Sequence, residues 1–152
     1  MRLSRHTDYA LRVLIHLAAV PERRASIAEI ARGYGISENH LMKIVHLLGR
    51  YGFIKTVRGR GGGIMLAKPA EEISIGIVIR HTEPDMVLAD CETCIIAPAC
   101  GLTGALREAL VAFLTVLDRY SLAQVARQKG ELAALLGLIE IEEARETRLG
   151  KR

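Results

Sequence analysis

The stretch 26–67 constrains the fold of this chain more than any other part of the sequence. It starts with Ser-Ile-Ala-Glu, which has the pattern of a capping box and predicts a helix through about residue 32. A glycine-containing turn at 33–36 follows, and Ser37 is placed to cap another helix over 38–50. Two short helices joined by such a turn predict a helix-turn-helix, whose second helix is the one that enters a DNA groove.

A β-hairpin is predicted directly after these helices. Residues 53–58 and 64–67 have the composition of two strands, and the turn between them is Gly-Arg-Gly-Gly-Gly. A hairpin with a basic, glycine-rich tip in this place predicts a winged helix. A nucleotide-binding loop is the alternative, but no Lys-Ser or Lys-Thr pair follows the glycines, and a strand comes next rather than a helix.

The charge of this region favours nucleic acid as a partner. Between residues 39 and 69 the chain has six basic side chains and no acidic one, and because the whole chain carries +4, the rest carries −2. Such a basic block in a mildly acidic body is typical of a nucleic-acid-binding surface, whereas ordinary solvated surfaces usually mix both signs. We expect double-stranded DNA to be contacted by the start of the second helix and by two arginines of the wing: Ser37, Asn39, His40, Lys43, Arg58 and Arg60.

The rest of the chain is predicted to be helical. A first helix is expected from Ser4 to about Val20, where Pro21 ends it. Further helices are expected over 75–82, 102–120, 121–128 and 131–146.

The long helix 102–120 has an apolar stripe of leucines and Phe113 that needs a covering partner. A second copy of the chain is the economical partner, because a symmetric homodimer also matches a palindromic operator. We therefore expect a mainly α fold: a winged helix-turn-helix with a β-hairpin wing and a long dimerisation helix. The expected segments are the DNA-binding domain 1–83, a cysteine loop 84–101, the dimerisation and C-terminal helices 102–140, and a mobile tail 141–152.

The chain has three cysteines, Cys91, Cys94 and Cys100, in a C-x2-C-x5-C spacing. Thiolates are soft ligands that hold zinc or iron–sulfur clusters. Three interpretations stay open from the residues alone: buried or disulfide-bonded cysteines, a zinc site completed by a histidine such as His81, and an iron–sulfur cluster with one further ligand. An odd cysteine count disfavours a disulfide framework, and the lack of a second C-x2-C or H-x3-H pair disfavours zinc.

Other classes of protein are disfavoured. The longest apolar run near the start is interrupted by Asp8 and Arg12 and does not read as a signal peptide, and no segment reaches the length of a membrane span. We therefore expect a cytoplasmic protein. We expect no enzyme, because the five histidines are scattered and no Ser-His-Asp or paired-carboxylate arrangement is evident.

Several motifs together resemble the Rrf family of winged-helix repressors over about residues 1–140. They are the opening Met-Arg-Leu-Ser and Thr-Asp-Tyr-Ala-Leu-Arg, the wing Val-Arg-Gly-Arg-Gly-Gly-Gly, the run Ile-Ser-Ile-Gly-Ile-Val-Ile-Arg and the cysteine loop. The runs Asn-His-Leu-Met-Lys-Ile and Ile-Ala-Pro-Ala-Cys are most similar to the nitric-oxide-sensing members of that family. The resemblance implies a homodimeric transcriptional repressor with nitric oxide as its effector.

The resemblance also implies a ligand set. By itself, Asp8 reads as a carboxylate that is favourable near the start of a helix. Carried over from the family, Cys91, Cys94 and Cys100 hold an iron–sulfur cluster, 4Fe-4S with 2Fe-2S as the alternative, and Asp8 is its fourth ligand from the partner subunit.

Two departures from the family pattern bear on that ligand set. Only two residues separate the first two cysteines, which is fewer than is typical of the family, and this change could alter the cluster type or shift a ligand to Asp90 or Glu92. Thr103 stands where the iron–sulfur-biogenesis regulators of the family have a histidine, which argues against ligation of their kind.

Overall fold

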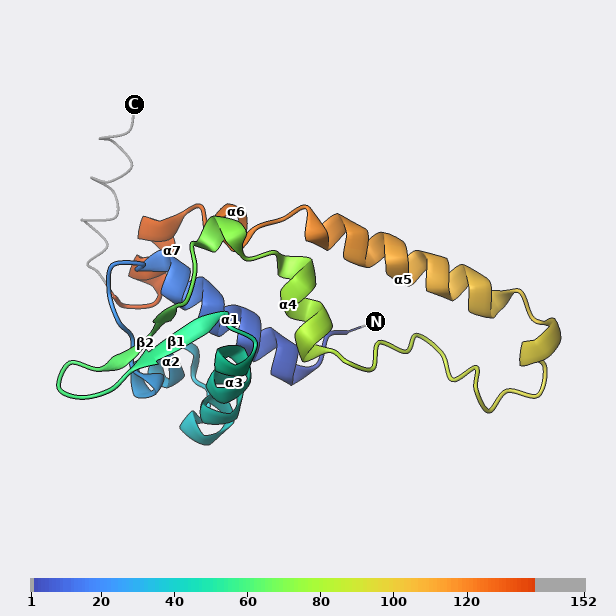
Figure 1. Ribbon diagram of the computed structural model, residues 1–152, viewed down its shortest axis with the longest axis horizontal. Coiled ribbons are helices and arrows are strands. Elements are labelled where there is room, and N and C mark those ends of the chain that lie inside the picture. The colour runs from blue at the N-terminus through green and yellow to red at the C-terminus, as the bar shows by residue number, and fades with distance from the viewer. Residues whose placement is uncertain (1, 139–152) are drawn as a thin grey trace, which may run out of the picture.

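The computed structural model of the protein describes residues 2–138, and Figure 1 shows a head from which a helical arm extends. The head contains α1, α2, α3, the hairpin and α4, and the arm is α5. The elements in chain order are α1 Arg5–Ala19, α2 Ile27–Tyr34, α3 Glu38–Arg50, β1 Ile54–Val57, β2 Gly63–Leu66, η1 Ala70–Glu72, α4 Ile75–Thr82, η2 Ala97–Ala99, α5 Leu102–Asp118, α6 Leu122–Val125 and α7 Lys129–Leu135.

Helix α1 runs through the centre of the head. The Ser4 hydroxyl accepts a hydrogen bond from the Thr7 amide at 3.2 Å, so the predicted N-cap forms. Ala10, Val13 and Leu14 are fully buried against the neighbouring helices. Burial of this apolar face is the main stabilisation of the head.

The two helices of the helix-turn-helix form, with two local differences from prediction. Ser26 accepts a hydrogen bond from the Glu29 amide at 3.1 Å, but the Glu29 carboxylate binds Arg23 and His16, so only half of the predicted capping box exists. Helix α2 continues to Tyr34 and ends at Gly35, whose φ of 64° needs a residue without a side chain. Ser37 is the N-cap residue of α3, yet its side chain makes no capping hydrogen bond.

The wing is an antiparallel pair in which Ile54 stands opposite Leu66. The strands are 54–57 and 63–66, each within a residue of prediction. Ala25 forms an isolated antiparallel bridge with Ile64 of β2. Its amide donates to the Ile64 carbonyl at 3.0 Å, and its carbonyl accepts from the Ile64 amide at 2.8 Å. A side chain at Gly63 would come within 2.8 Å of the Ala25 carbonyl oxygen, so glycine allows this close approach.

Helix α5 leaves the head with none of its residues buried. Its apolar stripe is half-buried, and Leu102, Val111 and Val116 on the same helix are exposed. It ends at Asp118, two residues before the predicted end. The helix predicted over 131–146 is present as α7, and its part beyond 138, like the tail 141–152, lies outside the described residues. Within residues 2–138, no helix is long and apolar enough to cross a membrane.

Candidate DNA interface and cysteine site

Helix α3 presents opposite faces to the core and to solvent. Leu41, Ile44, Val45 and Leu48 are buried. The predicted DNA-contacting residues of this element are all exposed: Ser37, Asn39, His40 and Lys43. Because the buried stripe fixes the rotation of the helix about its axis, these polar side chains share the outward face at its N-terminal end.

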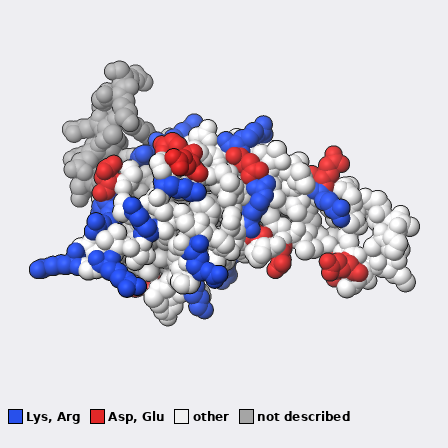
Figure 2. Space-filling view, in the orientation of Figure 1, with Lys and Arg blue, Asp and Glu red and all other residues white. Residues whose placement is uncertain are grey.

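The wing tip carries the other predicted DNA contacts, Arg58 and Arg60, and both are exposed. Figure 2 shows basic side chains gathered over the wing and the lower side of the head, whereas the far end of the arm is mostly uncharged in this view. Sequence reasoning missed Arg24, whose guanidinium donates to the Gly61 carbonyl at the wing tip at 3.0 Å. No local pattern signals this contact, since the two residues are 37 positions apart.

The cysteine loop, residues 84–101, lies between α4 and the far end of the arm (Figure 1). All three thiols are free, with Cys94 exposed and Cys91 and Cys100 half-buried. Successive turns bring the segment round on itself: the Cys94 amide donates to the Cys91 carbonyl at 3.4 Å, and the Cys100 amide donates to the Ala97 carbonyl at 3.3 Å. In residues 2–138, no three His, Cys, Asp or Glu side chains converge as a metal-binding group.

A cavity of about 260 Å³ lies beside the loop, and Cys91 is the one cysteine among its lining residues. Its walls include Cys91, Thr103 and Arg107, and the remainder is aliphatic. The Thr103 hydroxyl is buried and has no hydrogen-bond partner, so it is a donor without an acceptor. A thiolate-bound anionic group would supply that acceptor and would be attracted to Arg107, so the residues present fit such a group.

Two of the alternative ligands, Asp90 and His81, make hydrogen bonds within the chain. Asp90 accepts hydrogen bonds from the Thr93 amide at 3.4 Å and the Thr93 hydroxyl at 2.9 Å. His81 donates from Nδ1 to the Ile77 carbonyl at 2.8 Å, and its ring packs edge-on against Tyr51 with 4.4 Å between centroids.

Asp8 lies on α1 and pairs with Arg12 in the next turn of the same helix. The Arg12 Nε atom donates to Oδ1 at 3.0 Å, and Nη2 lies 2.9 Å from Oδ2. Both side chains are more than two-fifths exposed, at 45% for Asp8 and 41% for Arg12, so the pair is screened by water and weak. The structure does not bring Asp8 into one group with the cysteines of its own chain.

Glu83 joins the root of the cysteine loop to the start of α1. Its carboxylate accepts a hydrogen bond from the Ser4 amide, 79 positions away in the sequence. Burial alone would raise the pKa of Glu83, but the hydrogen bonds from Ser4 and Thr7 outweigh burial and leave the pKa below its usual value. This carboxylate therefore stays ionised and holds the two segments together.

A family match and a similar protein both identify relatives that are transcriptional regulators. Residues 3–128 match the Rrf2 family, described as "Iron-dependent Transcriptional regulator". The HTH-type transcriptional regulator NsrR of Bacillus subtilis (strain 168) is 47% identical over 146 residues, which are 92% of this chain and 100% of that protein.

Solved structures with the same fold include T. potens IscR, with a TM-score of 0.70 and 25% identity over 84% of this chain and 87% of that one. The oxidised form of Staphylococcus aureus CymR has a TM-score of 0.65 and 33% identity over 83% of this chain and 96% of that one. These neighbours confirm the predicted winged-helix architecture with its hairpin and long helix.

Proposed function

The chain belongs to the Rrf2 family of transcriptional regulators, and on that premise we propose that it is a homodimeric repressor whose DNA binding is controlled by an iron–sulfur cluster and nitric oxide. The observation that carries this proposal is the presence in one chain of two separate surfaces. A basic winged head lies at one end, and three free thiols lie on a loop that reaches the far end of an apolar arm. The first surface suits DNA and the second suits a soft metal cluster.

The head would read a palindromic operator in the cytoplasm. Asn39, His40 and Lys43 on the outward face of α3 would reach base edges in the major groove, and Ser37 would bind a phosphate beside them. Arg58 and Arg60 at the wing tip would enter the adjacent minor groove. Segment 1–83 is proposed as this DNA-binding unit.

The arm would make the dimer. Helix α5 exposes Leu102 and Val116 on one side, and apolar surface of this kind on a protruding helix favours a partner. A second copy supplies an identical apolar helix, and a twofold axis then gives two heads for two half-sites. Segment 102–140 is proposed as the dimerisation region.

The cluster would be held by Cys91, Cys94 and Cys100 of one subunit and by Asp8 of the partner subunit, with 84–101 as the binding loop. This assignment rests on the family resemblance and on the cavity beside Cys91. Ligation by Asp8 would break its exposed pair with Arg12, which costs little. When bound, the cluster, 4Fe-4S or alternatively 2Fe-2S, supplies iron that can bind nitric oxide, and a carboxylate-bound iron exchanges its ligand more readily than a thiolate-bound one.

The decisive experiment is a nitric oxide titration of anaerobically purified protein, followed by visible absorbance and operator binding. We expect a brown chromophore that a few equivalents per chain consume, with loss of DNA binding at the same point. If the protein is coloured but its absorbance does not change with nitric oxide, nitric oxide is not the effector, and the result indicates a sensor of iron or cluster supply. A Cys94→Ala variant should lose iron. A control variant outside the cysteine loop, Ser26→Ala, should keep it.

A thiol-switch regulator without a cluster is the second candidate. Cys94 is exposed, and one solved structure with the same fold is the oxidised form of Staphylococcus aureus CymR. This candidate predicts colourless protein after anaerobic purification and DNA binding that changes with a thiol oxidant but not with iron.

A further inference from the structure

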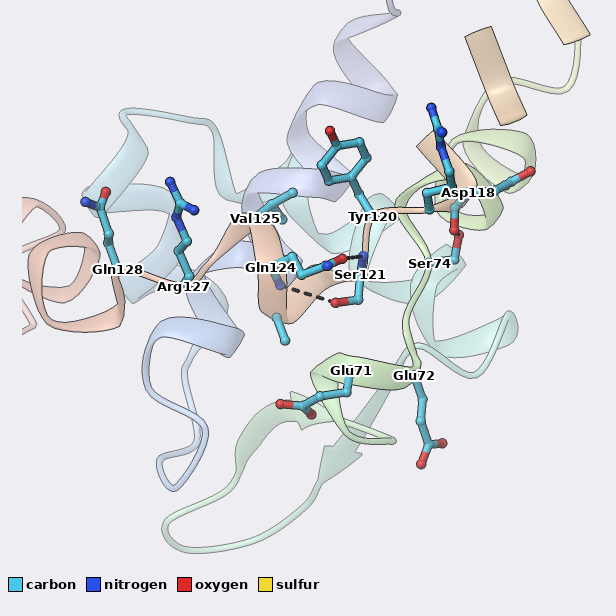
Figure 3. Close-up of a pocket in the computed structure, with 12 residues that line it drawn as sticks. Glu71, Glu72, Ser74, Asp118, Tyr120, Ser121, Gln124, Val125, Arg127 and Gln128 are labelled. Carbon is cyan, nitrogen blue, oxygen red and sulfur yellow. Dashed lines mark hydrogen bonds between the residues drawn. The ribbon is translucent and has the colours of Figure 1, made fainter. Parts of the chain in front are cut away.

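The C-terminal end of α5 meets one face of α4 at a joint between the arm and the head. Asp118, the last residue of α5, receives both terminal nitrogens of Arg80 on α4, with Nη2 2.8 Å from Oδ2. Such a paired arrangement fixes direction as well as distance, because two parallel hydrogen bonds resist rotation. The Ser74 hydroxyl also donates to the Asp118 carbonyl at 3.4 Å, and Figure 3 shows these two residues together at one side of a groove.

Backbone hydrogen bonds hold the chain immediately beyond the joint. The Ile75 amide donates to the Tyr120 carbonyl at 2.9 Å, and the Leu122 amide donates to the Ile73 carbonyl at 2.8 Å. Leu122 itself is fully buried in the core of the head. The chain is therefore anchored directly after Asp118 as well as at Asp118 itself.

Gly76 allows α4 and α5 to approach each other closely at the joint. A side-chain carbon placed on Gly76 would lie 2.1 Å from the Asp118 carboxylate and 2.8 Å from the Asp118 amide nitrogen. The carboxylate could rotate away, but the backbone nitrogen could not move without shifting α5. Only glycine permits the observed distance between α4 and α5.

The direction of the arm has a large effect because the arm is long. Seventeen residues of helix span about 25 Å, so a 10° change at the joint displaces the far end by about 4 Å, more than the ~3.4 Å rise of one base pair. Leu114 and Leu117, in the turns of α5 next to the joint, pack half-buried against the core of the head, and no described residue of α5 is fully buried.

We propose that the Arg80–Asp118 pair, seated over Gly76, is the specificity-determining joint that sets the spacing of the two operator half-sites. The inference rests on the proposed function as a DNA-binding dimer that pairs through α5. Arg80 and Asp118 act as positioning residues: they touch no base, but they fix where each reading helix stands relative to the twofold axis. Loosening the joint allows the heads to reach half-sites at several spacings, and the preference between spacings falls.

The test measures spacing preference rather than affinity alone. A palindromic duplex is selected from random-sequence DNA with the wild-type full chain, and then one or two base pairs are inserted or removed at its centre. The ratio of Kd on altered and selected duplexes is determined by fluorescence anisotropy for wild type, Arg80→Gln and Asp118→Asn. We expect both variants to lower this ratio about two- to fivefold, the effect of losing a solvent-screened ion pair, while sedimentation shows an unchanged dimer.

Two further variants make the result specific. Arg119→Gln removes the same charge from the adjacent residue, whose guanidinium makes no ion pair in the described part of the chain, and should weaken binding to every spacing equally. Gly76→Ala keeps both ionic partners but forces the helices apart, and should move the preferred spacing rather than erase it. If Arg80→Gln and Gly76→Ala both keep the wild-type ratio of Kd values, the joint does not set the spacing, and the proposed DNA-binding function still stands. If the wild-type chain selects no palindromic duplex, both the role of the joint and the proposed function as a DNA-binding dimer are wrong.

Discussion

His16 is fully buried in α1, and only one of its ring nitrogens has a hydrogen-bond partner. Nε2 donates to the Glu29 carboxylate at 3.3 Å, and the buried Nδ1, which carries no proton in this neutral form, accepts no hydrogen bond. Burial lowers the pKa of His16, although Glu29 opposes that shift by its hydrogen bond and charge. Arg23, which pairs with Glu29 on its outer side, also lowers the pKa. The residue is therefore neutral in the folded head.

This histidine predicts a loss of stability in mild acid. Above pH 6.5 it is neutral in both the folded and the unfolded chain and contributes no slope. Below that value the unfolded chain takes up a proton that the folded chain rejects, so the free energy of unfolding falls by up to ~1.4 kcal/mol per pH unit until the lowered folded pKa is reached. Urea unfolding between pH 7.5 and 5 measures the slope, and His16→Leu should flatten it. An equal slope in the two proteins would contradict the assignment.

At the scale of elements, the wing and α3 are expected to make different kinds of contact with DNA. In the proposed function, the exposed arginines of the wing would neutralise phosphates or enter a narrow groove, and the polar residues of α3 would read bases. Because only the first kind of contact releases counterions, salt dependence separates the two elements.

Arg60→Ala is accordingly predicted to reduce the slope of log affinity against log salt by about 0.9, the contribution of one phosphate contact. Asn39→Ala should leave that slope unchanged and reduce discrimination between operator and unrelated duplex, by about 1–3 kcal/mol for one bidentate contact. Binding measured at four salt concentrations distinguishes the two. If both variants lower only the slope, α3 is not the base-reading element.

The arm makes a separate prediction about assembly. Val116 is 42% exposed on α5, and burying a carboxylate there without a partner would be unfavourable in a dimer. Val116→Glu should shift sedimentation from dimer to monomer without lowering the melting temperature of the head. Thr115→Glu adds the same charge next to it, on the polar side with Glu108, and should leave the dimer in place. A dimeric Val116→Glu protein would mean that α5 does not form the interface.

At the scale of the whole molecule, the parts were predictable and the connections between them were not. Caps, glycine turns and apolar periodicity are local signals, and they predicted the helix-turn-helix, the wing and the long helix. Arg80–Asp118 and Ser4–Glu83 join residues 38 and 79 positions apart, so no periodicity reports them. The cysteines were predictable as a cluster motif because they are close in sequence, while their convergence on one metal, and the division of the chain at residue 83, stay predictions.

Leu122 tests whether the head is complete without the later chain. It follows the cysteine loop and the arm in sequence, yet it is fully buried in the core together with α1. Leu122→Ala should lower the free energy of unfolding by about 2–5 kcal/mol, the usual cost of a cavity left by a buried leucine. Leu135→Ala, at a position that is 79% exposed, is the matched control and should change it by less than about 0.5 kcal/mol. Equal stability of the two variants would mean that the head does not depend on the returning chain.

The place of Leu122 in the chain also orders events during synthesis. A ribosome translates all three cysteines before it adds the leucine that closes the core of the head. A chain that stops before Leu122 lacks the side chain that fills this part of the core, and we expect its head to be less stable than that of the full chain.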